Sequence, residues 1–215
     1  KDTYEKKLSE IFGDQESFEK LDKNPLLKDI EYFKKVLNTI QPYVSKSTFE
    51  SLEANEALKK GFGILKKHKS QEPLRPIISC INSITEGSET FLAKLIRPIV
   101  EKCSFATKST KDFKSIFLKN RSKFSDDYEV MSFDASSLFT NINVTKVIEY
   151  ILDKIYESPE TERSYFNETF YDDKGFEQLV DIPPRDTLKN FMIAVLTKFS
   201  TFSSHAGFYK QKKMT

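Results

Sequence analysis

One aspartate of this sequence stands where a carboxylate could take part in phosphoryl transfer. Residues 129–134 alternate in character, with Met131 and Phe133 on the face opposite to Asp134, which predicts a short strand ending at that carboxylate. A carboxylate at a strand end can bind Mg²⁺, and a second carboxylate nearby allows two ions to clamp the attacking and leaving oxygens. As a bare pattern, however, an aspartate after a strand is more often a turn residue or a helix cap.

A run of basic side chains interleaved with phenylalanines is a second group that could do chemistry. Seven basic residues against one acid, Asp112, give residues 102–123 a net charge of +6. Two interpretations stay open: a solvated helical face whose aromatic rings point into the core, or a surface that follows a phosphate backbone. The second interpretation predicts nucleic-acid contacts from the five basic residues of 108–121. The basic residues are Lys102, Lys108, Lys111, Lys114, Lys119, Arg121 and Lys123, and the interleaved rings are Phe105, Phe113 and Phe117.

A predicted β-hairpin carries a third basic group. The apolar run Phe62–Leu65 and the segment Arg75–Ile81 are interpreted as two strands joined by a basic turn over 66–73. Arg75 on an apolar strand is the more informative residue, because burying an unpaired guanidinium group is costly. Lys66 is one of five lysines in this region, so a simple solvated side chain is the competing interpretation.

Amphipathic helices are expected to position these segments. Apolar side chains recur at helical spacing in five stretches, and Asn143 is a plausible N-cap of the fourth. The polar stretch 157–177 carries seven acids and is predicted to be a mobile surface insertion. The predicted helices cover 26–40, about 47–58, 91–99, 144–155 and 188–199, and a second hairpin is predicted at 201–210.

Composition limits the class of protein. The chain has 215 residues, of which 38% are hydrophobic and 31% charged, which indicates one ordinary globular domain or two small ones. No stretch approaches the roughly 20 apolar residues of a membrane span, so no membrane partner is expected. Residues 1–10 lack the apolar run of a secretory signal, and two cysteines cannot form a disulfide framework. An intracellular location, nuclear or cytoplasmic, is therefore expected.

Four collinear segments resemble one polymerase family. Ser132–Ile142, which reads SFDASSLFTNI, resembles motif A of reverse transcriptases and is similar to its form in Penelope-like retroelements. Gly63–Lys69 resembles the family's GLPKIHK segment, although Leu65 replaces its proline. Leu74–Ser79 matches the family's LRPIVS, and Phe208–Gln211 is similar to the YxQ run that enters motif B. The resemblance covers roughly residues 5 to 215.

The resemblance implies a right-hand polymerase fold of the α+β class, with antiparallel strands backed by helices. It implies a helical N-terminal region at 1–58, a fingers-like region at 59–125 and a partial palm at 126–215, with the polar insertion at about 157–182. The implied activity is RNA-directed DNA synthesis by two-metal nucleotidyl transfer in the complete protein. Mg²⁺ is then the cofactor, and the partners are an RNA template, a DNA primer and deoxynucleoside triphosphates.

The resemblance also assigns roles to individual residues. Asp134 becomes the catalytic, first metal-binding carboxylate, and the carbonyl of Ala135 becomes a further metal ligand. Phe139 becomes the ring that excludes a ribose 2′-hydroxyl. Lys66 and Arg75 become the residues that hold the triphosphate, which suits their chemistry because arginine grips phosphate bidentately and lysine acts as a mobile point charge.

The sequence also departs from the family pattern. Lys212-Lys213-Met214-Thr215 follows Gln211 where the family has a glycine-rich run, and no Tyr-x-Asp-Asp hairpin occurs. We therefore expect these 215 residues to be a polymerase fragment that is inactive alone. Two alternatives stay open. A nucleic-acid-binding remnant predicts salt-dependent binding to an RNA–DNA hybrid without primer extension. A helical interaction protein with a chance motif predicts no nucleic-acid affinity.

Overall fold

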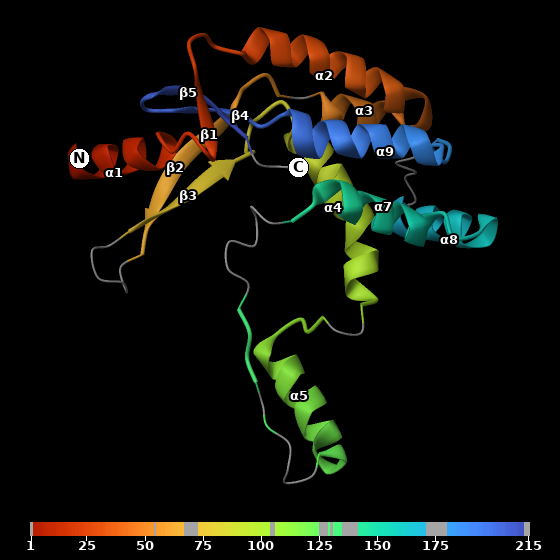
Figure 1. Ribbon diagram of the computed structural model, residues 1–215. Helices are drawn as coiled ribbons and strands as arrows, with labels where there is room; N and C mark the ends of the chain where they lie inside the picture. The colour runs from red at the N-terminus through yellow and green to blue at the C-terminus, as the bar shows by residue number, and fades with distance from the viewer. Residues whose placement is uncertain are drawn as a thin grey trace.

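The fold of the chain combines helices with a single sheet. The computed structural model describes residues 2–53, 55–66, 73–103, 106–124, 129, 131–134, 142–170 and 180–212. Within these residues there are eight α-helices and one mixed five-stranded sheet (Figure 1). The predicted α+β class is therefore confirmed. No helix in these ranges is long and apolar enough to cross a membrane.

The sheet joins segments that lie far apart in the sequence. Its strands follow the spatial order β1-β5-β4-β2-β3, and only the contact between β2 and β4 is parallel. Both predicted hairpins are present, as β2–β3 and β4–β5. The edge strand β1 was not predicted, and it pairs with β5 from the opposite end of the chain. The bounds are β1 Phe18–Leu21, β2 Lys59–Leu65, β3 Leu74–Ser79, β4 Thr201–Ser204 and β5 Gly207–Gln211.

Several helices begin or end where local signals predict, but the second predicted helix ends at Leu52 and not at Leu58, and the helix at residues 2–12 was not predicted. Asn24-Pro25 precedes α2 and Gln41-Pro42 follows it, and the Asn143 side chain accepts a hydrogen bond from the Lys146 N–H at 2.9 Å at the start of α7. The helices are α1 Asp2–Phe12, α2 Leu26–Ile40, α3 Lys46–Leu52, α4 Glu86–Glu101, α5 Thr110–Asn120, α7 Val144–Ile155, α8 Pro159–Phe170 and α9 Arg185–Ile193. Shorter 3₁₀ turns lie at Gln41–Tyr43 and Arg121–Lys123, and a π-helical turn at Ala194–Lys198 extends α9.

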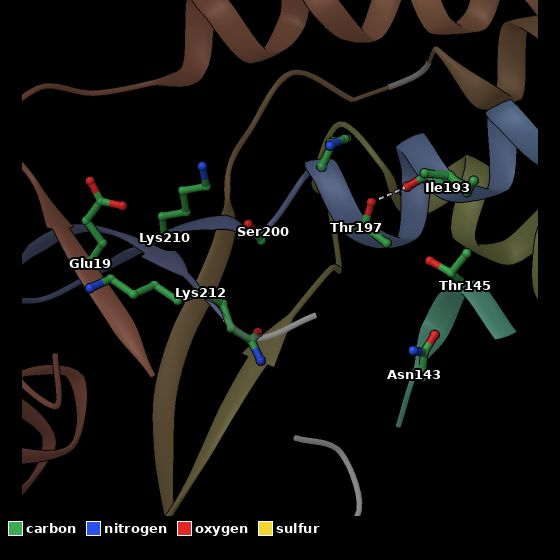
Figure 2. Close-up of a pocket in the computed structure, with 10 residues that line it drawn as sticks. Glu19, Asn143, Thr145, Ile193, Thr197, Ser200, Lys210 and Lys212 are labelled. Carbon is green, nitrogen blue, oxygen red and sulfur yellow. Dashed lines mark hydrogen bonds between the residues drawn. The ribbon is translucent and has the colours of Figure 1, made fainter. Parts of the chain in front are cut away.

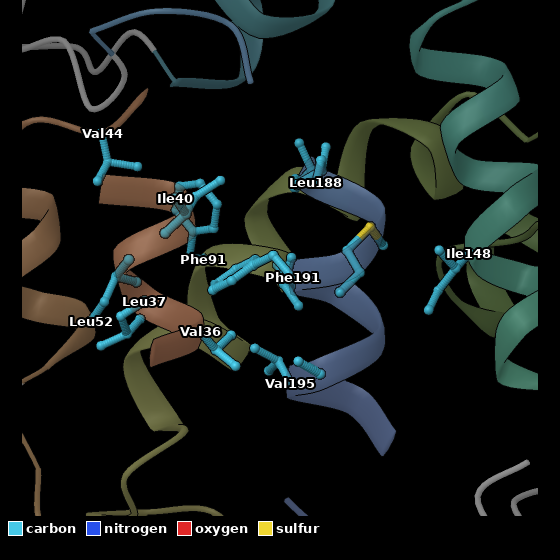
Figure 3. Close-up of a cluster of buried hydrophobic side chains, with 14 of the residues drawn as sticks. Val36, Leu37, Ile40, Val44, Leu52, Phe91, Ile148, Leu188, Phe191 and Val195 are labelled. Atoms are coloured by element: carbon cyan, nitrogen blue, oxygen red, sulfur yellow. The ribbon is translucent and has the colours of Figure 1, made fainter. Parts of the chain in front are cut away.

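The main hydrophobic core lies between the helices. Each of α2, α4, α7 and α9 buries one apolar stripe, as the spacing of their residues predicts. Figure 3 shows Leu37 and Ile40 of α2 on one side of Phe191 in α9, with Ile148 of α7 on the other. All four of these side chains are essentially inaccessible to solvent. The core is connected to the sheet through α9, whose C-terminal extension leads into β4.

The prediction of a mobile insertion at 157–177 is wrong for residues 159–170. These residues form α8, and Tyr165 and Phe166 on it are buried in the main core. The Tyr165 hydroxyl donates a hydrogen bond to the carbonyl of Leu95 in α4. The two adjacent rings anchor the helix although its remaining residues are mostly polar, because a buried aromatic side chain contributes a large apolar area. Residues 171–179 of the predicted insertion lie outside the described residues.

Candidate functional site

The predicted triphosphate-binding residues lie at the tip of the β2–β3 hairpin. Ile64 pairs with Arg75, and the Lys66 N–H extends the ladder by donating to the Pro73 carbonyl at 3.0 Å. Because opposite residues share a face and side chains alternate along a strand, Lys66 and Arg75 lie on the same face as diagonal neighbours. The structure therefore brings this predicted pair together, although their roles stay a prediction.

The face that carries the pair is open to solvent. Arg75 is exposed, and Phe62 and Ile64 on the same face are also exposed. Among the described residues, neither Lys66 nor Arg75 forms an ion pair. The argument that Arg75 needs a partner because it is buried is therefore wrong, since β3 buries only its other face. No described acid therefore competes with an anion from solvent for either cation.

The opposite face of the hairpin packs on α1. Gly61 lies against the rings of Phe202 and Phe12, and an added Cβ there would lie 2.5 Å from the Phe202 ring. These rings belong to a second, smaller core that also contains Leu8, Leu74 and Tyr209. The absence of a side chain at Gly61 thus allows the hairpin to lie close to α1, which fixes the hairpin on the body of the protein.

An ion pair fixes the base of the hairpin to α4. The Lys59 Nζ lies 2.6 Å from a Glu89 carboxylate oxygen, and the Thr85 hydroxyl donates to the same carboxylate at 2.7 Å. Burial raises the pKa of Glu89, but the Lys59 charge and hydrogen bonds from Lys59, Thr85 and Cys80 lower it more, so that it lies below its ordinary value. At the base of the hairpin Glu89 therefore neutralises Lys59, whereas Lys66 and Arg75 at the other end have no such partner among the described residues.

The segment before Asp134 does not form the predicted strand. Glu129 and residues 131–134 have no regular secondary structure, and Phe133 is 89% exposed. Alternation stabilises a strand only when a neighbour supplies hydrogen bonds and one face is buried. Each described strand pairs within the five-stranded sheet, and none of them borders this segment. Asp134 is exposed, and Ala135 and Phe139 lie outside the described residues.

A magnesium site cannot be built from the described residues. They contain no group of three or more His, Cys, Asp or Glu side chains that could hold a metal ion. Asp134 stands alone on an exposed segment, whereas Mg²⁺ requires an octahedral set of oxygen ligands. These residues alone therefore do not complete a magnesium site, the Mg²⁺ of the complete protein stays a prediction, and we assign no chemical step to it.

The predicted basic segment forms an arm that buries nothing. Figure 1 shows α5 projecting away from the sheet and the remaining helices, and no residue of α5 is buried. Phe113 and Phe117 are 53% and 37% exposed, so the interpretation in which the aromatic rings point into the core is wrong for these two. Phe105 lies outside the described residues. Lys108, Lys111, Lys114, Lys119 and Arg121 are at or near the surface of this arm and make no ion pair among the described residues.

The structure also contains a polar cavity that the sequence analysis missed. It has a volume of about 610 Å³ and lies between β1, β5, the start of α7 and the end of α9 (Figure 2). Lys210 on β5 and Lys212, which follows this strand, line one side together with Glu19 on β1, and Asn143 and Thr145 lie on the opposite side. The Lys212 Nζ donates to the Gln15 carbonyl at 2.8 Å. The residues that line the cavity come from four separate segments. The sequence analysis had noted one of them, the YxQ-like run Phe208–Gln211, but it predicted no cavity there.

Comparison of the chain with protein-family models, with curated proteins and with solved structures finds no match. The resemblance of Ser132–Ile142 to motif A therefore rests on the residues of the chain itself. What the geometry adds is a cationic hairpin tip and a projecting basic arm, which are two exposed surfaces suited to anionic ligands.

Proposed function

We propose that the chain forms the fingers and the front part of the palm of a Penelope-like reverse transcriptase, which copies an RNA template from a DNA primer. The proposal begins from the four collinear segments, including Ser132–Ile142 and Leu74–Ser79. The single observation that carries it is the position of Lys66 and Arg75 as diagonal neighbours on one exposed hairpin face. The resemblance assigns binding of the nucleotide triphosphate to these two residues.

The chemistry of the hairpin tip supports this assignment. A guanidinium group presents a planar set of donors that fits two phosphate oxygens, and a lysine ammonium group can move to a third. Among the described residues, no carboxylate pairs with Lys66 or Arg75 and competes for them.

In the proposed polymerase Asp134 is the first catalytic carboxylate, and further carboxylates complete the active site in the complete protein. The alternative of nucleic-acid binding without catalysis is favoured by one observation, the exposure of the basic α5 arm. That alternative needs neither Asp134 nor the hairpin pair. The two functions are therefore separated by variants at Asp134.

The test is primer extension on an RNA template by the complete polymerase. We expect Asp134→Ala to abolish extension while template binding stays within about twofold of the wild type. Glu129→Ala is the matched control, because it removes an exposed carboxylate from the same irregular segment, and it should leave extension unchanged. Extension that survives Asp134→Ala would overturn the proposed polymerase role and leave the binding alternative.

A further inference from the structure

We propose that the α5 arm binds unpaired nucleic acid by stacking bases on a ladder of phenylalanine rings. The aromatic ladder consists of Phe113, Phe117 and Phe124, and Lys114 and Arg121 flank it as phosphate contacts. This inference rests on the nucleic-acid part of the proposed function and not on its polymerase chemistry. It names both the binding surface and the form of nucleic acid that this surface prefers.

The rings of the ladder are close to parallel. The centroids of Phe113 and Phe117 are 6.2 Å apart with 26° between the ring planes, and those of Phe117 and Phe124 are 5.9 Å apart with 19°. All three side chains are more than one-third exposed. Three exposed rings in a similar orientation are unusual for a globular surface, where exposed apolar side chains are commonly scattered. Such a row of rings can stack successive bases.

Cations stand beside the rings. On a helix, residues three and four apart are neighbours, so Lys114 and Arg121 both lie next to Phe117. No basic residue from Lys108 to Lys123 forms an ion pair among the described residues. The one acid of the arm, Asp112, accepts a hydrogen bond from the Lys108 N–H at 3.0 Å at the start of the helix, away from Phe124. Positively charged side chains therefore lie beside the aromatic ladder in the described part of the arm.

This combination favours unpaired nucleic acid over other occupants. A polyanion can pair with the cations. The unpaired bases of a single strand can also stack on the phenylalanine rings, whereas the bases of a duplex are already stacked on one another. A membrane-bound helix presents one broad apolar face opposite a charged face. The exposed apolar side chains of α5 are Phe113, Ile116, Phe117 and Leu118, and by helical spacing Lys114 lies between Phe117 and Leu118, so a cation interrupts the apolar surface.

The experiment measures binding of the whole chain to fluorescently labelled oligonucleotides by anisotropy. The probes are a 12-residue oligo(dT), a 12-residue oligo(U) and a 12-base-pair duplex. A double variant, Phe113→Leu with Phe117→Leu, keeps apolar side chains but removes two aromatic faces. We expect its affinity for both single strands to fall by about tenfold or more, because one stacked base contributes about 1–3 kcal/mol. Affinity for the duplex should change less than threefold.

Matched variants separate stacking from charge and from folding. Tyr150→Leu removes an exposed ring from α7 and should leave binding unchanged. Lys114→Gln with Arg121→Gln should reduce the slope of log affinity against log salt by about 0.7 for each lost phosphate contact. Since α5 buries no residue, all of these variants should unfold at the wild-type temperature.

Unchanged single-strand affinity in the Phe113→Leu, Phe117→Leu variant would overturn the inference. So would a wild-type preference for the duplex, or binding of the arm to anionic phospholipid vesicles without binding to oligonucleotides. Triphosphate binding in the same preparation distinguishes these failures from failure of the proposed function, because it depends on Lys66 and Arg75 and not on α5.

Discussion

The hydroxyl group of Tyr4 accepts a hydrogen bond from the Gly63 N–H at 2.9 Å and donates one to the Gly63 carbonyl at 3.2 Å. The backbone groups of Gly63 face the edge of β2 away from β3, and β4 pairs with this edge only at Lys59 and Lys60. Tyr4 therefore satisfies both backbone groups of Gly63 at an otherwise open edge of β2. Through this contact α1 supports the hairpin that carries Lys66 and Arg75.

We expect Tyr4→Phe to lower the free energy of unfolding by about 1–2 kcal/mol, because it leaves a backbone donor and an acceptor of Gly63 without their partner. Urea denaturation measures the change from the shift in midpoint at constant slope. Tyr150→Phe removes a hydroxyl from an exposed ring and serves as the control, with no expected effect. Equal midpoints for Tyr4→Phe and the wild type would show that the contact does not support the hairpin.

A methyl group at Gly61 is expected to separate the hairpin from the smaller core. The added Cβ would lie 2.5 Å from the Phe202 ring, which is fully buried and cannot move aside. We expect Gly61→Ala to destabilise the protein by about 1–3 kcal/mol, as overpacking does in a dense core. A Cβ at Gly63 would lie 3.0 Å from Leu74 Cδ1 and 3.3 Å from Leu8 Cδ1, which are wider distances than at Gly61, so Gly63→Ala should cost less. A larger loss for Gly63→Ala in thermal unfolding would contradict this packing.

The ion pair between Lys59 and Glu89 predicts a pH dependence of stability. A carboxyl group whose pKa is lowered by folding contributes stability that is present above its ordinary value, 4.5, and lost as the pH falls through the folded value. We therefore expect the wild type to be more stable than Glu89→Gln at pH 7, and the difference to shrink between pH 5 and pH 3. Urea denaturation across this range provides the measurement.

The exposed Glu31 provides the control for this pH series. It pairs with Lys35 on the surface of α2 at 3.0 Å, where solvent screens the interaction. Glu31→Gln should follow the wild-type pH profile throughout. A stability difference between Glu89→Gln and the wild type that stays constant from pH 7 to pH 3 would argue against an ionised, paired Glu89.

Local signals in the sequence predicted both hairpins and helices corresponding to α2, α3, α4, α7 and α9, but not α1 or α8, and they could not supply partners from elsewhere in the chain. The four residues of β1 alternate too briefly to indicate a strand, and they are ordered by β5, which lies almost 190 residues later. The reverse error occurred at 129–134, where a convincing alternation finds no neighbouring strand among the described residues. The segment of α8 was interpreted as an insertion because of its many acidic residues, and the two aromatic residues that bury it, Tyr165 and Phe166, were not considered.

The candidate site was predictable to a similar degree. The resemblance to reverse transcriptases pointed to Lys66 and Arg75, but their common face depends on the register of the hairpin, which the turn sequence alone does not fix. The phenylalanines of α5 were visible, while their exposure required knowing that no other element covers the helix. The cavity beside Lys210 combines four segments through tertiary packing, so no motif could indicate it.

The most direct test of the central claim is binding of deoxythymidine triphosphate to this chain, measured by isothermal titration calorimetry with thymidine as the ligand that lacks phosphates. Lys60→Gln is a matched control, because Lys60 lies on the same strand and face but six residues from Lys66, at the base of the hairpin. We predict that the triphosphate binds and thymidine does not. Arg75→Gln and Lys66→Gln should each weaken binding by roughly tenfold, the cost of one charge-assisted hydrogen bond, and Lys60→Gln should not. Equal affinities for all three variants and the wild type would contradict the account.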